Sequence, residues 1–202
     1  GAETEDFPEG DEKKKFIGER LGRPMYKLMN DAAIKMKSIN NNLPIAICNG
    51  DLLFVEIIAE ECTDIDIYGT NMYRGKSFTD AFEIVKKELD MPILFTEFGA
   101  DAFNVISNKE DQEMQAFYMV ENWKEIYQNA AGMGKSGNAI GGFIFQFSDG
   151  WWKYGQTKNL DVHDNNASWF NRGYNLDVEG INSSNNNMNE EWFGVCAKGP
   201  TN

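Results

Sequence analysis

One pattern occurs four times in the sequence: a short apolar segment with strand-like composition ends in polar residues, and a helical pattern separates it from the next. The four segments are LPIAICNGD (residues 43–51), DIDIYGTNMYRG (64–75), MPILFTEFGAD (91–101) and AIGGFIFQFSDGWWK (139–153). Strands that alternate with helices pair in parallel through right-handed crossovers, so all four carboxyl ends lie on one side. The pattern therefore predicts an α/β fold, an open sheet or a barrel, with its site at that edge.

Helical patterns precede and separate these segments. Pro24 suits the first turn of a helix, and an apolar stripe predicted to face the core follows it: Met25, Met29, Ala32, Met36 and Ile39. Ser77, with Asp80 three residues later, predicts the N-terminal cap of the next helix. The longest helical pattern extends from Asp111 to about Ala131, and three glycines end it.

The composition excludes several classes of function. The formal net charge is -13, from 19 Lys and Arg against 32 Asp and Glu, so neither nucleic acid nor an anionic membrane is an expected partner. No apolar run of about 18 residues is present, and no signal peptide opens the chain. Cys48, Cys62 and Cys196 are widely spaced, and the single histidine, His163, reads as a surface side chain. Neither a metal site nor a cofactor is predicted.

The composition also divides the chain into three parts. Residues 1–11 form a polar N-terminal loop, residues 12–155 carry the strand and helix patterns, and residues 156–202 form an irregular, Asn-rich excursion. The first and the last strand–helix units look truncated, which suggests a piece of a larger protein.

Carboxylates and aromatic side chains at the strand ends favour carbohydrate chemistry. Sugar rings stack on tryptophan, and cleavage of a glycosidic bond needs two flanking carboxyl groups. Glu97, directly after an apolar strand, would be the nucleophile of such a reaction, although its spacing alone is equally typical of a cap or an ion pair. Asp101 is interpreted as a hydrogen-bond acceptor for its own loop. The alternative to an enzyme is a non-catalytic carbohydrate-binding module that uses the same residues.

PILFTEFGAD (92–101), preceded by GTNMY (69–73) and followed by GGFIFQFSDGWW (141–152), resembles the second half of the catalytic barrel of glycoside hydrolase family 2. Its clan relatives are enzymes of the β-glucuronidase and β-galactosidase type. The resemblance covers roughly residues 12–155. It implies a partial (β/α)8 TIM barrel, strands five to eight with their helices, followed by an irregular C-terminal segment. It also implies a retaining hydrolase that acts on O-glycosidic bonds and is compatible with a secreted or periplasmic parent enzyme.

The resemblance assigns roles residue by residue. Glu97 corresponds to the nucleophile at the end of strand seven, and Tyr73, at the end of strand six, to the tyrosine that hydrogen-bonds it. The substrate-binding residues that it implies are Asn71, Trp151, Trp152, Asn49 and Asp51.

One departure from the family pattern limits this assignment. The family's acid/base is the Glu of an Asn-Glu pair at the end of strand four, which should precede residue 1 on this alignment. The Asn-Glu pair at Asn189 and Glu190 lies in the polar tail and does not fit by chain order. The chain alone is therefore expected to be inactive. Uncovered sheet edges predict self-association or pairing with the missing half-barrel. The sugar, linkage and anomer are not specified.

Overall fold

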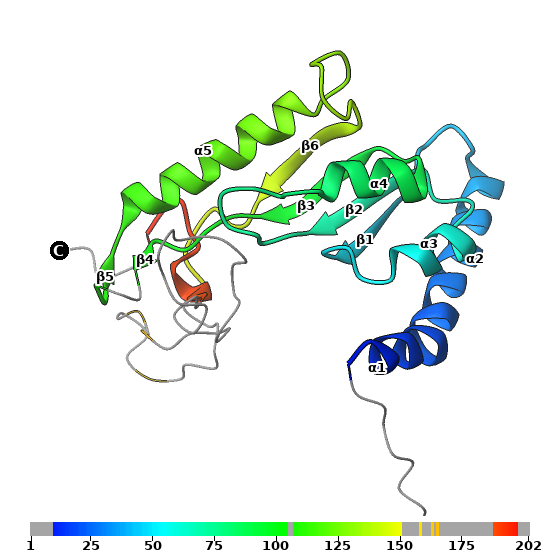
Figure 1. Ribbon diagram of the computed structural model, residues 1–202, viewed down its shortest axis with the longest axis horizontal. Helices are drawn as coiled ribbons and strands as arrows, with labels where there is room; N and C mark the ends of the chain where they lie inside the picture. The colour runs from blue at the N-terminus through cyan, green and yellow to red at the C-terminus, as the bar shows by residue number, and fades with distance from the viewer. Residues whose placement is uncertain are drawn as a thin grey trace, which may run out of the picture.

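The computed structural model describes residues 10–104, 107–150, 158, 163, 165 and 188–197, and within them it contains one parallel sheet of four strands (Figure 1). The strands are β1 (Ala46–Gly50), β2 (Ile67–Asn71), β3 (Ile93–Phe98) and β6 (Ala139–Ile144), in the order β1-β2-β3-β6. All three pairings are parallel, as the strand–helix alternation predicts. The α/β class is thus confirmed, and among the described residues the sheet is open rather than a closed barrel.

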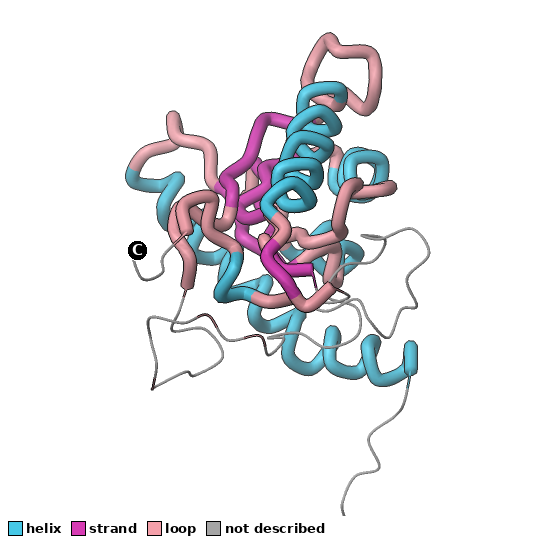
Figure 2. The backbone as a smooth tube through the Cα atoms, turned by 90° about the vertical axis from the view of Figure 1, so that its left-hand side faces the viewer, coloured by secondary structure: helices cyan, strands magenta, loops and turns pink. Residues whose placement is uncertain are grey.

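The helices among the described residues are α1 (Gly10–Ile17), α2 (Arg23–Ile39), α3 (Val55–Glu61), α4 (Ala81–Leu89) and α5 (Gln112–Gln128), with the π-helical turn η1 (Gly18–Gly22) between α1 and α2. Helices α2 to α5 cover one face of this sheet, and α1, which joins α2 through this short turn, has no buried residue of its own (Figure 1). In Figures 1 and 2 the sheet lies between α2 at one end and α5 at the other. Burial in β1 alternates because only one face of the strand is covered. Ile47 and Asn49 are buried, whereas the residues between and beside them are exposed.

An aromatic cluster forms the centre of the core. Phe95 of β3 stacks on Phe78 with ring centroids 4.0 Å apart and meets Phe82 edge-on at 5.4 Å. Phe98 adds a further edge-on contact, and all four side chains are at most 1% exposed. Burying a Phe side chain contributes about 1.5–3 kcal/mol. This cluster therefore fixes β3, and with it the position of Glu97, against α4.

The predicted core-facing stripe of α2 is only partly confirmed: Met29 packs against the core, but the helix is rotated so that the other predicted residues do not form its buried side. Met25, Met36 and Ile39 are 43%, 56% and 77% exposed, whereas Tyr26 and Ala33 are buried. Polar contacts set this rotation. The Tyr26 hydroxyl donates to Asn49 at 2.8 Å, and Asn30 accepts the backbone N–H of Asp64. Periodicity predicted the helix correctly, but these hydrogen bonds decide which side faces the sheet.

Several predicted boundaries also shift. Helix α1 begins at Gly10, inside the expected N-terminal loop, with Asp11 and Glu12 in its first turn, where the helix dipole favours acidic side chains. Ser77 does not cap α4, whose N-cap is Asp80. Instead, the Ser77 hydroxyl donates to Glu125 at 3.0 Å and so ties this loop to α5. Helix α5 begins after Asp111, whose side chain accepts the Met114 N–H, and it has the same 17-residue length as α2.

The C-terminal part of the chain returns to the sheet. Most of residues 156–202 lies outside the described residues, but the segment Met188–Ala197, which contains the 3-10 turn η4 (Glu190–Trp192), packs at the ends of β3 and β6 (Figure 1). A short hairpin of β4 (Phe103–Asn104) and β5 (Lys109–Glu110) lies beside it. In the part of the chain described here, no helix is long and apolar enough to cross a membrane.

Candidate active site

The carboxyl ends of β2 and β3 meet on the face of the sheet that the helices leave uncovered. Asn71 pairs in register with Glu97, and the pairing shifts by one residue at Thr96. The backbone N–H of Met72 donates to the Glu97 carbonyl at 2.9 Å, which holds the two strand ends together beyond the ladder. This irregularity turns the Glu97 side chain toward the residues that follow β2.

Tyr73 and Glu97 form the central contact of the site. The Tyr73 hydroxyl donates to Glu97 Oε2 at 2.9 Å. The Tyr73 ring packs edge-on against Phe193 and Phe145, with centroids 5.6 and 6.5 Å away. Burial, and then the Glu97 charge and hydrogen bond, raise the pKa of Tyr73. The phenol therefore stays protonated and acts as a fixed donor to one carboxylate oxygen, which leaves the other oxygen for chemistry.

Asn71 is oriented by two neighbours on the same face. Its Oδ1 accepts from the Thr96 hydroxyl at 2.7 Å and from the Cys48 thiol at 3.5 Å. Thr96 Oγ1 and Cys48 Sγ are themselves 3.2 Å apart. Since both donors engage the carbonyl oxygen, the amide's two N–H donors remain for a ligand, and Nδ2 bonds to none of the described residues. Asn71, Tyr73 and Glu97 are thus brought together, as the sequence predicted.

Asn49 and Asp51 lie apart from this group. The Asn49 side chain points to the helix-covered face, where it accepts from Tyr26 and donates to Leu53 O and Tyr68 Oη, both at 2.9 Å. Asp51 accepts two bonds from Arg74, at 2.5 and 3.0 Å. Both side chains are engaged in holding the loop after β1, so the structure gives them a supporting position rather than a place beside Glu97.

The predicted aromatic platform, Trp151 and Trp152, lies outside the described residues. Asp101 does act as a buried acceptor, and one of its partners is the backbone N–H of Asn189 at 2.7 Å. It therefore anchors the returning C-terminal segment.

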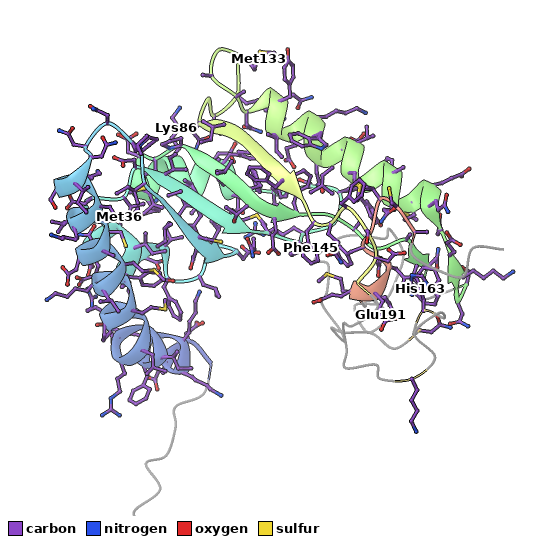
Figure 3. The ribbon with its side chains drawn as sticks, turned by 180° about the vertical axis from the view of Figure 1, so that it is seen from behind. Met36, Lys86, Met133, Phe145, His163 and Glu191 are labelled. Carbon is purple, nitrogen blue, oxygen red and sulfur yellow. The ribbon has the colours of Figure 1, made fainter. Side chains whose placement is uncertain are left out.

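Two groups at the docked C-terminal segment were not predicted from the sequence. The docked segment brings Glu190 close enough to contribute to the raised pKa of Tyr73, although chain order had set the Asn189–Glu190 pair aside. The His163 side chain, labelled in Figure 3, is 12% exposed. Its Nε2 lies 2.8 Å from Asp149 Oδ2, and its ring packs against Trp192 at a tilt of 34° with the centroids 4.2 Å apart. His163, Asp149 and Trp192 line a cavity of about 470 Å³, and neither Glu97 nor Tyr73 is among its described lining residues. Among the described residues, no group of three potential ligands could hold a metal ion.

The fold and the site together define an α/β protein with a carboxylate–tyrosine pair at the end of a parallel sheet. No family model matches the chain, and no curated protein matches it. Among solved structures, it is similar to the β-glucuronidase of Bacteroides uniformis, with 16% identity over 71% of this chain and a TM-score of 0.46. A β-glucuronidase of an uncultured Clostridium sp. has 14% identity over 72% and a TM-score of 0.36. The chain spans 17% and 37% of their lengths.

Proposed function

We propose that this chain carries the nucleophile side of the active site of a retaining glycoside hydrolase that acts on O-glycosidic bonds. The observation that supports this most is the hydrogen bond from Tyr73 to Glu97 at the carboxyl end of the sheet. A carboxylate fixed through one oxygen presents the other in a defined direction, which is what in-line attack on an anomeric carbon requires. Both are also residues that the resemblance to glycoside hydrolase family 2 assigns.

In this mechanism, a Glu97 oxygen bonds to the anomeric carbon as the glycosidic C–O bond breaks, giving a covalent glycosyl intermediate. The departing oxygen receives a proton from a second carboxylic acid. That carboxylate then removes a proton from water, which attacks the anomeric carbon and releases Glu97. Tyr73 keeps the nucleophile in place, and the Asn71 amide can donate to a sugar hydroxyl.

The proposal places β1, β2, β3 and β6 as strands five to eight of a (β/α)8 barrel, with the acid/base on an earlier strand outside this sequence. General acid–base catalysis contributes on the order of 100- to 10,000-fold in rate. The earlier strands would also hold much of the substrate. This chain alone is therefore expected to show no measurable turnover.

The uncovered face and the outer strands fit the same proposal. Ile140 and Phe143 of the outer strand β6 are 54% and 64% exposed. Strand edges and apolar side chains of this kind tend to pair with another chain. We expect the chain to bind the other half of the barrel or, without it, to self-associate. Light scattering that shows only monomer at high concentration would contradict this.

The deciding experiment uses a longer form of the protein that includes the strands which this proposal places before Gly1. A panel of 2-deoxy-2-fluoro glycosides with a dinitrophenolate leaving group needs no acid for the first step and traps the glycosyl–enzyme. Mass spectrometry of the digested protein should find the sugar on Glu97. Glu97→Gln should abolish both labelling and hydrolysis of aryl glycosides, whereas Glu113→Gln, at an exposed position of α5, should change neither.

Each alternative gives a distinct result. Label on another carboxylate, or hydrolysis that survives Glu97→Gln, would refute the nucleophile assignment. Turnover by the present chain that depends on Glu97 would refute the missing acid/base. Sugar binding without any hydrolysis by the longer form would favour a carbohydrate-binding module, whose predicted platform, Trp151 and Trp152, lies outside the described residues.

A further inference from the structure

The segment Met188–Ala197 is held at the strand ends by hydrogen bonds from several parts of the chain. The backbone N–H groups of Ala102 and Gln146 donate to the carbonyls of Trp192 and Phe193, at 2.9 and 3.1 Å. The Gln115 side chain donates to carbonyls of the same segment at 3.2 and 3.3 Å. Because these contacts come from the ends of β3 and β6 and from α5, the segment has one defined position on the strand ends.

Gly194 shows how closely the segment docks. A Cβ atom at this position would lie 2.2 Å from the Asp149 nitrogen and 2.6 Å from its Oδ1, closer than such atoms can approach. The Gly194 N–H donates to that same Oδ1 at 2.8 Å. Glycine is therefore required for the contact itself, and any larger residue must lift the segment away from the end of β6.

The docked segment inserts one aromatic ring beside the site. Phe193 is fully buried and contacts Tyr73 at 5.6 Å with the rings at 80°, and it also contacts Phe145 at 6.0 Å. Phe193 and Phe145 thus form two contacts of the Tyr73 ring. Tyr73 lies in the irregular stretch after β2, where no strand ladder fixes it. The orientation of its hydroxyl therefore depends on the packing of its ring.

We propose that the segment Met188–Ala197 is a working part of the candidate site, in which Phe193 is a positioning residue that holds Tyr73 where its hydroxyl donates to Glu97. The same docking brings the Glu190 charge near that hydroxyl, which supports a raised Tyr73 pKa. A segment more than 40 residues beyond β6 thereby completes the support of a residue at the end of β2. The catalytic meaning of this contact rests on the proposed function, but the contact itself can be tested without it.

The first test is a titration of the chain labelled with [13Cζ]tyrosine, in which the Tyr73 signal is identified by its loss in Tyr73→Phe. In the unaltered protein this signal should not titrate in the range of ordinary tyrosines. Phe193→Ala should bring its titration down toward that range, and Phe193→Leu, which keeps more of the volume, should do so less. Gly194→Ala should act like Phe193→Ala, because it lifts the whole segment.

Val85→Ala is the matched control, since Val85 is also fully buried but lies in α4, away from the strand ends. It should destabilise the protein without moving the Tyr73 titration. If Phe193→Ala fails to fold, Phe193→Leu and Gly194→Ala carry the test. A Tyr73 titration that is the same in these variants as in the unaltered protein would overturn the proposal.

The second test uses hydrolysis by the longer form. Phe193→Ala should lower kcat about tenfold to a hundredfold, the loss expected for a hydrogen bond to a charged group, with little change in KM. In the Tyr73→Phe background the same substitution should add little, because its effect passes through Tyr73. Full additivity would refute the positioning role. If Glu97 is not the nucleophile, the Tyr73 titration can still show that Phe193 positions Tyr73. The positioning role and the proposed function can therefore be refuted independently.

Discussion

Asn49→Ala distinguishes a supporting asparagine from a substrate-binding one. Asn49 and Asn71 lie near the ends of neighbouring strands, and both are predicted from the sequence to bind substrate. In the structure, the Asn49 side chain accepts the Tyr26 hydroxyl at 2.8 Å and donates to the Leu53 carbonyl at 2.9 Å, in a region where Tyr26 is 2% exposed. Replacing Asn49 with alanine takes a hydrogen-bond partner from both the Tyr26 hydroxyl and the Leu53 carbonyl, and the buried Tyr26 hydroxyl is out of reach of the surrounding solvent.

The expected loss follows from the groups left behind. The Tyr26 hydroxyl keeps only a 3.5 Å contact to Leu53 O, and that carbonyl loses its good donor. The Tyr68 hydroxyl still donates to Asp51 O at 2.6 Å and is largely satisfied. A buried hydroxyl and a part-buried carbonyl left poorly paired cost about 1–3 kcal/mol each, so the free energy of unfolding should fall by about 2–6 kcal/mol. That is a large part of the stability of about 5–15 kcal/mol typical of a domain.

Urea unfolding followed by circular dichroism measures this loss, with an unchanged slope as evidence that the same transition is observed. Asn71→Ala is the matched control, because its partners Thr96 and Cys48 lie on the uncovered face, where water can replace the amide. It should cost about 1 kcal/mol or less. If Asn49→Ala costs no more than Asn71→Ala, the supporting role given to Asn49 is wrong.

Three further predictions follow from single sites. Tyr73→Phe should lower kcat of the longer form about tenfold to a hundredfold while changing stability by about 1 kcal/mol or less, because the ring contacts remain; an unchanged kcat would contradict this. Gly69→Ala should destabilise the sheet by about 2–3 kcal/mol in urea unfolding, since its Cβ would lie 2.2 Å from the Ile47 carbonyl oxygen, whereas Gly50→Ala meets nothing closer than 3.7 Å and should cost less. Burial raises the pKa of Cys62 to about 11. Its contribution to stability should therefore be full below about pH 8.5, the ordinary pKa of a thiol, and should decline as the pH rises from there to about 11. Cys62→Ala should weaken this alkaline decline, and an unaltered pH dependence would refute the assignment.

The alternation of strands and helices predicted the sheet and the edge where the site lies, because parallel strands must end on the same side. It did not predict which side chains share a face. Asn49 pairs with Thr70 in the sheet, while Asn71 pairs with Gly50, so the two asparagines differ by one residue in register. A one-residue offset moves a side chain to the opposite face. Only the paired structure, with Tyr26 and Tyr68 bonded to Asn49, shows which asparagine is buried.

The C-terminal segment shows why local composition could not complete the site. Its residues form no periodic pattern, and what fixes it is a set of single contacts with residues far away in the chain, such as Asp101 with the Asn189 N–H and Asp149 with the Gly194 N–H. The expected order of strands sets Glu190 apart from a strand-four acid, but it does not restrict where a long connection brings a side chain. Tyr73 therefore receives its orientation from a ring at position 193, and its environment from a segment that strand order alone would set aside.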